Sequence, residues 1–184
     1  MKTVIVKELM VPIQEYATVS QEASLYEAVL ALEKAQMAFD PSKHKHRAIL
    51  VLDRKKNIVG KLIMLDILMA LEPKYGELEA AGTLSRSGYS PDLIKSMLED
   101  NALWLEPFQF VCERASQLKV SDCVKPTEDS EYVDEKATLA EAIHQLVVYP
   151  HHSLLVTSDD KVVGILRLTD VFTKICDKIK TCEF

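Results

Sequence analysis

The sequence is poor in glycine and has no dense basic run, and each shortage excludes a class of function. Only five glycines occur among 184 residues, which excludes a glycine-rich loop that cradles phosphates. Lys and Arg number 22 against 28 Asp and Glu, and the net charge is −6. We expect no nucleic-acid partner and no anionic membrane surface as a partner, because both require a positive field on the protein.

Long apolar runs are also missing. The longest stretches, such as AILVL at 48–52, have the length of a strand, whereas a membrane span needs about 20 apolar residues. Lys7 and Glu8 interrupt the N-terminal stretch before a signal-peptide core can form. These patterns predict a cytoplasmic protein without a membrane partner.

The sequence lacks the common catalytic and metal-binding motifs. It contains no G-x-S-x-G, G-x-x-x-x-G-K-[ST] or H-E-x-x-H motif, and we therefore expect a protein that is not an enzyme. Its four cysteines form no C-x-x-C pair, which favours reduced thiols. Histidines at 44–46 and 151–152 precede equivalent apolar runs, but no carboxylate or cysteine has zinc-site spacing, so no metal is expected.

What the chain does contain is an internal repeat. IVGKLIMLDIL at 58–68 and VVGILRLTDVF at 162–172 each place an aspartate at the same distance after a glycine. The two pairs are Gly60 with Asp66 and Gly164 with Asp170. A repeat of this length predicts two copies of one supersecondary unit.

Each copy has a readable local structure. Ser24 and Thr138 begin S/T-x-x-E capping boxes, which predict helix starts. Two short apolar runs separated by a polar turn follow in each copy and predict a hairpin. A second helix is expected near each repeated aspartate. Each unit is therefore predicted to run strand, helix, strand, strand, helix.

The segment between the copies is apolar rather than linker-like. Ser90 followed by Pro91 predicts a helix start, and Trp104, Phe108 and Phe110 predict that this segment packs against something. The sequence thus predicts an α+β protein with a first repeat at 1–71, a helical connector at 72–119 and a second repeat at 120–184.

On these motifs the chain resembles a tandem pair of CBS domains, the module named after cystathionine β-synthase and also called a Bateman module. The resemblance implies two β-α-β-β-α repeats that pack through their sheets with pseudo-twofold symmetry. It also implies a homodimer and clefts that bind adenine nucleotides or other adenosyl compounds between the repeats.

The resemblance further implies a set of ligand-binding residues. Asp170 and Asp66 would accept hydrogen bonds from ribose hydroxyls, as an acceptor-only carboxylate can, close to Gly164 and Gly60. The backbone that holds adenine would be that of Thr18, Val19, Tyr132 and Val133, and His152 could line the cleft.

Two residues depart from the family pattern, which has Ser or Thr three residues after the glycine. Ile63 offers no hydrogen bond there, whereas Arg167 offers phosphate a charge-assisted contact. The hydroxyl of Thr169 can serve the ligand or cap the helix. We therefore expect the site at Asp170 to bind ligand in preference to the site at Asp66.

Two functions follow. The first is a stand-alone regulatory protein that binds AMP, ADP, ATP or S-adenosylmethionine and signals occupancy through its homodimer or through a protein partner on the connector. The alternative is a ligand-free dimerising scaffold. In that case the aspartates stabilise helix starts by about 0.3–1 kcal/mol, and the glycines serve close packing or a bulge.

Overall fold

The structure is a computed structural model that describes residues 4–38, 46–80, 88–149 and 151–181. The first repeat contains a three-stranded sheet in which β3 is central, parallel to β2 and antiparallel to β4. Two helices complete this repeat. Its elements are β2 (Thr18–Ser20), α1 (Leu25–Ala38), β3 (Ala48–Leu52), β4 (Ile58–Ile63) and α2 (Met64–Leu71).

The second repeat has the same element order. β6 is parallel to β5 and antiparallel to β7, and the N-terminal strand β1 adds to the edge of β7. The predicted order of strand, helix, strand, strand, helix is therefore confirmed in both copies. The elements are β1 (Val11–Pro12), β5 (Tyr132–Asp134), α7 (Leu139–Val148), β6 (Ser153–Ser158), β7 (Lys161–Arg167) and α8 (Leu168–Lys180).

The capping boxes start the helices that the sequence predicts. The Ser24 hydroxyl accepts from the Glu27 N–H at 3.2 Å, and the Glu27 carboxylate accepts from the Ser24 N–H at 2.7 Å. Thr138 and Glu141 form the same reciprocal pair at the start of α7. Each box satisfies backbone donors that have no partner within the helix, so local sequence alone determines these two boundaries.

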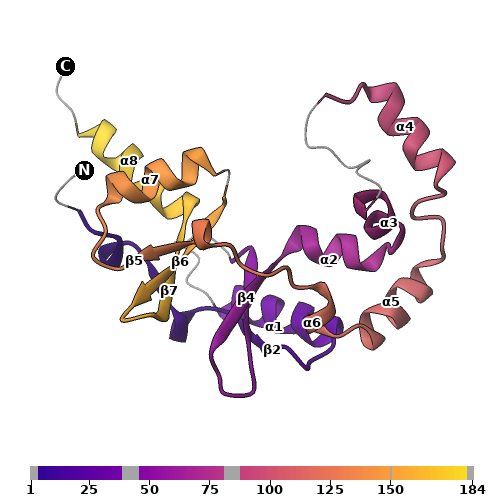
Figure 1. Ribbon diagram of the computed structural model, residues 1–184, viewed down its shortest axis with the longest axis horizontal. Coiled ribbons are helices and arrows are strands. Elements are labelled where there is room, and N and C mark those ends of the chain that lie inside the picture. The colour runs from indigo at the N-terminus through magenta and orange to yellow at the C-terminus, as the bar shows by residue number, and fades with distance from the viewer. Residues whose placement is uncertain (1–3, 39–45, 81–87, 150, 182–184) are drawn as a thin grey trace.

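The chain segments that precede the two repeats cross over. Val6 is fully buried in the core of the second repeat, where its N–H donates to Ala137 O at 2.9 Å. The Leu139 N–H donates back to Val4 O at 2.8 Å. Figure 1 shows this N-terminal segment beside α7 and α8.

The opposite exchange occurs in the first repeat. Val120 is fully buried in the first core, and its N–H donates to Ala23 O at 2.9 Å. The Leu25 N–H donates to Leu118 O at 2.8 Å. These bonds join positions equivalent to those that are bonded in the first exchange. Each repeat is therefore completed by the segment that precedes the other repeat in the sequence.

Because of this exchange, the two cores cannot be separated by cutting the chain at one point. The predicted division into a first repeat, a connector and a second repeat (1–71, 72–119 and 120–184) therefore describes the repeat in the sequence and not separate folding units. A central cluster joins the two sheets and contains Leu50 of β3 and Leu155 of β6, which occupy equivalent positions and are fully buried. Burying an aliphatic side chain of this size contributes about 1.5–3 kcal/mol.

The connector is helical and packs on the first repeat. Its helices are α3 (Lys74–Ala80), α4 (Pro91–Asp100) and α5 (Phe108–Gln117), and α6 (Val120–Cys123) follows at the start of the second sequence repeat. The described residues also include 3-10 helices at Val6–Glu8, Ile13–Glu15 and Asp129–Glu131. The Ser90 hydroxyl accepts from the Leu93 N–H, so the predicted helix start is confirmed. Figure 1 shows α3, α4 and α5 as an arc on the side of the molecule away from α8.

Hydrogen bonds join parts of the connector to one another and to the end of the first repeat. The Trp104 N–H donates to the Glu72 carboxylate at 2.7 Å, and the Arg114 guanidinium donates to Leu71 O and to Glu106. By contrast, α4 contains no buried residue. Among the helices in the described ranges, none has the length and apolar character needed to cross a bilayer.

Candidate functional site

The site around Asp170 begins where β7 ends and α8 starts. Arg167 is the last residue of β7, and Asp170 lies in the first turn of α8. The Arg167 guanidinium donates from Nε and Nη2 to the two carboxylate oxygens of Asp170, at 2.5 and 2.7 Å. Both side chains are largely withdrawn from solvent, with exposed fractions of 7% and 17%. The sequence predicted a phosphate contact for Arg167, and the structure shows this ion pair.

The ion pair leaves acceptor capacity on the carboxylate. Each carboxylate oxygen carries about two lone-pair sites, so a bidentate arginine leaves room for two further donors. The planar guanidinium also fixes the orientation of the carboxylate, because two parallel N–H···O bonds restrict its rotation. Asp170 is therefore a pre-oriented carboxylate that can accept two further hydrogen bonds.

A cavity of about 470 Å³, here called the Asp170 cavity, lies beside this pair. One wall is the N-terminal segment 8–12, which includes apolar Leu9, Met10 and Val11. The other wall is polar and comes from β7 and α8. Its side chains are Arg167, Asp170, Thr173, Lys174 and Asp177. The volume lies within the range of about 300–1,000 Å³ that is usual for small-molecule sites.

Position 164 requires a glycine because the apolar wall of this cavity packs directly against its backbone. A Cβ atom at this position would lie 2.7 Å from Val11 O and 2.9 Å from Met10 Sδ. At Gly60, a Cβ atom would lie 3.2 Å from Val124 Cγ2, where the other crossing segment passes. The close-packing alternative therefore accounts for both glycines, and at Gly164 the packing partner is the wall of the Asp170 cavity.

A second cavity of about 270 Å³, here called the axial cavity, lies between the starts of α2 and α8. Equivalent positions of both repeats line it. They include Arg47 and His152, Ile63 and Arg167, and Leu65 and Thr169. Arg167 lines both the axial cavity and the Asp170 cavity, so the two cavities adjoin. The structure thus brings together four predicted residues, Asp170, Arg167, Thr169 and His152.

Two buried rings support the ion pair. The rings of Tyr16 and His46 meet edge to face with centroids 4.1 Å apart, and both residues are buried. Burial raises the pKa of Tyr16 to about 12. Burial also lowers the pKa of His46, and the positive charge of Arg167 lowers it further. Both rings are therefore neutral at neutral pH, and neither adds a charge beside Arg167 and Asp170.

The corresponding place in the first repeat has different chemistry. Asp66 Oδ2 accepts from the Ile63 N–H at 2.9 Å, which makes Asp66 a cap for α2. Burial raises the pKa of the Asp66 carboxyl. Ile63, Met69 and Ala70 stand where the second repeat has Arg167, Thr173 and Lys174. The first repeat therefore presents neither a cation nor a hydroxyl at these positions.

The residues whose backbone is expected to hold adenine do not line the Asp170 cavity. Val19 and Val133 are buried in separate cores, Thr18 lines none of the cavities described here, and Tyr132 lines a third cavity. The order of the second sheet explains the difference, since β5 and β1 lie at opposite edges. The Asp170 cavity is closed by segment 8–12, which ends with β1.

Sequence reasoning missed that segment, together with Tyr16 and His46. A signal for the segment was present, because Pro12 and Pro126 recur at equivalent positions after similar apolar residues. His44 lies outside the described residues. Within the described ranges, no group of three or more His, Cys, Asp or Glu side chains could hold a metal ion.

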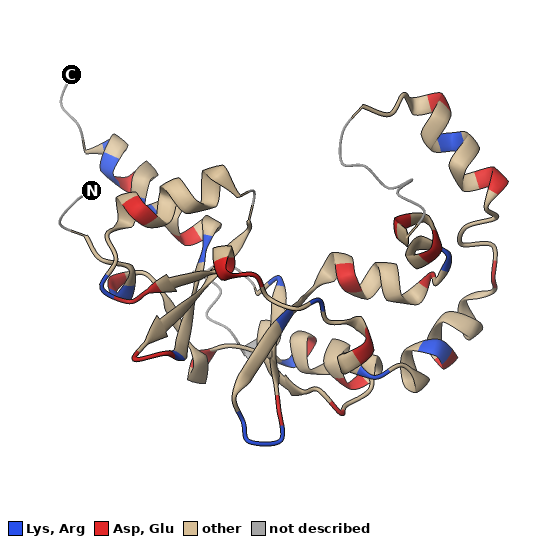
Figure 2. Ribbon diagram, viewed as in Figure 1, with Lys and Arg blue, Asp and Glu red and all other residues tan. Residues whose placement is uncertain are grey.

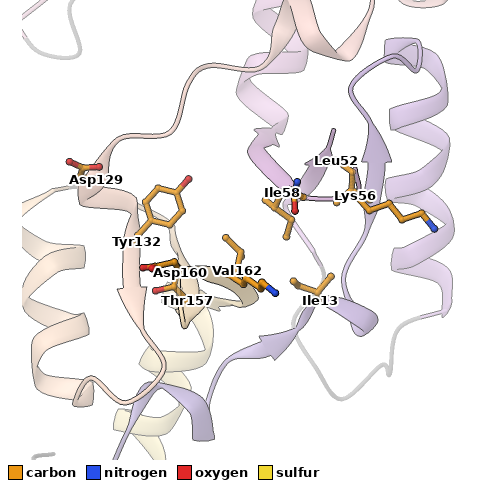
Figure 3. A pocket seen from close by; sticks show the side chains of 11 residues that line it. Ile13, Leu52, Lys56, Ile58, Asp129, Tyr132, Thr157, Asp160 and Val162 are labelled. Carbon is orange, nitrogen blue, oxygen red and sulfur yellow. The ribbon is translucent and has the colours of Figure 1, made fainter. Parts of the chain in front are cut away.

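The third cavity, here called the hairpin cavity, measures about 640 Å³ and lies at the other ends of the strands (Figure 3). The β3–β4 and β6–β7 hairpins supply most of its lining, with contributions from Ile13, Asp129 and Tyr132. None of its lining residues belongs to the Asp170 cavity or to the axial cavity.

Two sheets joined at a common core, with equivalent helix starts facing one cavity, define a paired-repeat module. The model of the CBS domain family matches residues 6–73 and again residues 120–177. These two ranges make up more than half of the chain, and the protein therefore belongs to the CBS domain family as a tandem pair.

Solved structures of CBS proteins have a similar fold. A CBS domain-containing protein from Bacillus anthracis is 20% identical, with 96% of each chain covered and a TM-score of 0.61. CBSX2, a CBS-pair protein from Arabidopsis thaliana, was solved in complex with AMP; it is 19% identical over 95% of this chain and 97% of that chain, with a TM-score of 0.60.

A third similar structure is the CBS domain of a bacterial CNNM/CorC family Mg²⁺ transporter in complex with ATP. It is 16% identical over 95% of this chain and 89% of that chain, with a TM-score of 0.57. A search of curated proteins gives no match to this chain.

Proposed function

We propose that this CBS-pair protein is regulatory rather than catalytic and binds one adenine nucleotide in the Asp170 cavity. The observation that carries the proposal is the orientation of the Asp170 carboxylate by Arg167 at the wall of that cavity. The two ribose hydroxyls would donate to the two carboxylate oxygens, and the apolar wall at Leu9, Met10 and Val11 would contact the adenine.

The phosphates would lie toward the axial cavity. The start of α8 is located there, and a helix start offers backbone N–H groups and the positive end of the helix dipole to an anion. Arg47, His152 and Arg167 supply side-chain donors to the same cavity. These groups favour AMP, ADP or ATP over S-adenosylmethionine, which has no phosphate. The AMP and ATP complexes of the similar CBS proteins support this class of ligand.

The first repeat supports a single site in each chain. Asp66 is engaged as a helix cap, and Ile63, Met69 and Ala70 cannot hydrogen-bond a nucleotide through their side chains. We therefore propose that Asp170 binds the nucleotide and that Asp66 stabilises α2. The matched aspartates provide an internal control for any binding experiment.

The proposed signal is a change in the arrangement of the two repeats. The axial cavity, where the phosphates would lie, is lined by equivalent positions of both repeats. Ligand can shift that arrangement only by the difference in its affinity for the two states. The change would reach the connector through α5, because Arg114 ties α5 to the end of α2, and a protein partner would read it there.

We further propose that the chain forms a homodimer through α2 and α8. Leu68 and Phe172 occupy equivalent positions on these helices, and both are more than half exposed. A twofold interface uses the same patch on both subunits. Two equivalent apolar helices on one chain fit such an arrangement with a second copy.

A thermal-melt panel with AMP, ADP, ATP and S-adenosylmethionine tests the binding proposal. Asp170→Asn removes the charge and keeps the shape, and Asp66→Asn is the matched control. Ligand at 100 times its Kd should raise the Tm of the wild type and of Asp66→Asn by about 5–10 °C. The shift should be lost in Asp170→Asn. A shift that survives in Asp170→Asn, or is lost in Asp66→Asn, would contradict the assignment.

The second candidate is the ligand-free scaffold, and one observation favours it. Asp170 already accepts two hydrogen bonds from Arg167, so the site is electrostatically complete without a ligand. The absence of a Tm shift with every nucleotide in the panel would favour the scaffold.

A further inference from the structure

The hairpin cavity lies at the opposite end of the strands from the proposed nucleotide site. β7 runs from Lys161, which lines the hairpin cavity, to Arg167, which lines the other two. Seven residues of strand separate these ends by roughly 20 Å at about 3.3 Å per residue. A ligand in the hairpin cavity would therefore not compete for space with a nucleotide at Asp170.

The floor of the hairpin cavity is apolar surface that the central core leaves uncovered. Ile13, Ile58, Tyr132 and Val162 pack against the central cluster but are only partly buried, and all four line the cavity. Figure 3 shows the Tyr132 ring forming one side of the cavity, with Val162, Ile58 and Ile13 around it. The Tyr132 hydroxyl is held by Thr127 Oγ1 at 2.6 Å, which fixes the ring as a wall for an apolar group.

Charged groups of both signs surround this floor. The lining includes Lys56 and Lys161, and also Asp129 and Asp160. Within the described part of the chain, none of these four side chains forms an ion pair. Figure 2 shows a basic tip on the β3–β4 hairpin and acidic residues at the tip of the β6–β7 hairpin.

The rim of the cavity is also pre-organised. Asp53 Oδ1 accepts from the N–H groups of Lys55 and Asn57, and Asp53 Oδ2 accepts from the Asn57 amide at 3.1 Å. Asn57 lines the cavity, and its side-chain carbonyl keeps its acceptor capacity. A rim that is fixed before binding reduces the entropy that a small ligand loses on association.

These features argue against a second nucleotide. No α-helix begins among the lining residues, so no helix dipole faces the cavity. Asp129 and Asp160 would repel phosphate groups. A ligand complementary to this cavity is a small molecule with an apolar body, one anionic group and one cationic group.

We propose that the hairpin cavity binds a free apolar or aromatic α-amino acid. The side chain of the amino acid lies on the floor against Tyr132, Ile58 and Val162. Its carboxylate is met by Lys161 and its ammonium by Asp160. Because both hairpins contribute, the bound amino acid bridges the two repeats from the side opposite the nucleotide.

Isothermal titration of the full chain tests this inference with phenylalanine and leucine as probes. Phenethylamine lacks the carboxylate and 3-phenylpropionate lacks the ammonium, so each analogue should bind about tenfold more weakly than phenylalanine. Lys161→Gln and Asp160→Asn should weaken phenylalanine binding by a similar factor. Asp160→Asn preserves the left-handed backbone at this position, where φ is 60°, because asparagine tolerates that conformation.

Matched controls separate the hairpin cavity from its surroundings and from the nucleotide site. Lys55→Gln and Asp159→Asn change charges on the same two hairpin tips but do not line the cavity, and both should bind phenylalanine as the wild type does. Asp170→Asn should also leave phenylalanine binding unchanged. The inference is overturned if neither amino acid binds at millimolar concentration, if 3-phenylpropionate or phenethylamine binds as tightly as phenylalanine, or if the lining variants bind as the controls do.

Discussion

Arg167 and Asp170, three residues apart, form a bidentate ion pair that the equivalent residues of the first repeat cannot form. Ile63 stands in place of the arginine, and Asp66 bonds to backbone instead. The two repeats therefore use the same aspartate position in different ways. In one repeat the carboxylate is presented to a cavity, and in the other it caps a helix.

Replacing Arg167 alone should destabilise the fold. Arg167→Ile leaves the Asp170 carboxylate partly buried without its cation, which should lower the free energy of unfolding by about 3 kcal/mol. The double variant Arg167→Ile with Asp170→Asn should recover part of this loss, because the uncompensated charge is gone. Urea unfolding of the two single variants and the double variant measures the coupling. If the losses in unfolding free energy of the two single variants add up to that of the double variant, the ion pair contributes nothing to stability.

Asp66→Asn should change how stability depends on pH. Burial raises the folded-state pKa of Asp66 above its ordinary value of 3.8, so the folded state binds the proton more tightly than the unfolded state does. The stabilisation by the protonated carboxyl is present below pH 3.8 and is lost as pH rises through the folded-state pKa. The variant should therefore gain stability relative to the wild type as pH rises from 4 to 7.

Urea midpoints at several pH values measure that difference. Asp122→Asn, at an exposed position, is the control for replacing an aspartate without burial. A stability difference for Asp66→Asn that falls toward neutral pH would contradict the raised pKa.

Gly164→Ala should weaken the attachment of the N-terminal segment. The added methyl group would lie 2.7 Å from the backbone oxygen of Val11, and overpacking of this kind costs about 1–3 kcal/mol. Gly60→Ala should cost less, because its nearest neighbour is a Val124 methyl group at 3.2 Å, which can move. Urea unfolding gives both costs, and limited proteolysis near residues 4–12 should be faster only in Gly164→Ala.

Lys61 and Glu131 form a second ion pair that joins the two repeats. Lys61 also donates to Ser153 O at 2.9 Å, and both charged side chains are largely buried. Glu131→Gln should lower the free energy of unfolding by about 3 kcal/mol, because it leaves a buried ammonium without its partner. Adding Lys61→Ile, which copies Ile165 of the second repeat, should restore most of that loss. A double variant as unstable as Glu131→Gln would show that the lysine is required in itself.

Phe172→Lys tests the proposed dimer. A charge at the centre of an apolar interface should convert the dimer into a monomer, as measured by sedimentation velocity, while circular dichroism remains unchanged. Lys178→Glu, on the same helix and outside the apolar pair, should remain dimeric. A wild-type chain that sediments as a monomer at high micromolar concentration would contradict the proposal directly.

The sequence predicted the features that depend on neighbours in the chain. Ser24 and Thr138 each cap a helix through a glutamate three residues away, and the hairpins follow from short apolar runs around polar turns. The repeat also led to the correct family. The expected ribose contact at Asp170 and the preference for that site over Asp66 remain predictions.

Features that depend on distant segments could not be predicted in this way. The crossing of Val6 and Val120 into opposite cores leaves no local signal, because both are ordinary apolar residues. The pairing of Arg167 with Asp170 required knowing that a strand ends one residue before the helix begins. Tyr132 lines the hairpin cavity and not the Asp170 cavity because β5 and β1 lie at opposite edges of the second sheet, an order that cannot be inferred from the order of strands along the chain. The expected backbone contact of Tyr132 with adenine remains a prediction.

The exchanged segments also have a consequence for synthesis of the protein. The segment around Val6 and Val11 packs against α7 and β7, which are synthesised more than 100 residues later, roughly the length of a domain. The first core likewise cannot be completed until Val120 has been synthesised. Neither half of a nascent chain can bury its core alone, so folding is delayed until most of the chain has emerged, and contacts of such long range slow it further. The exchanged segment around Val6 must remain soluble during that interval, and Lys7 and Glu8 supply charge among its apolar residues.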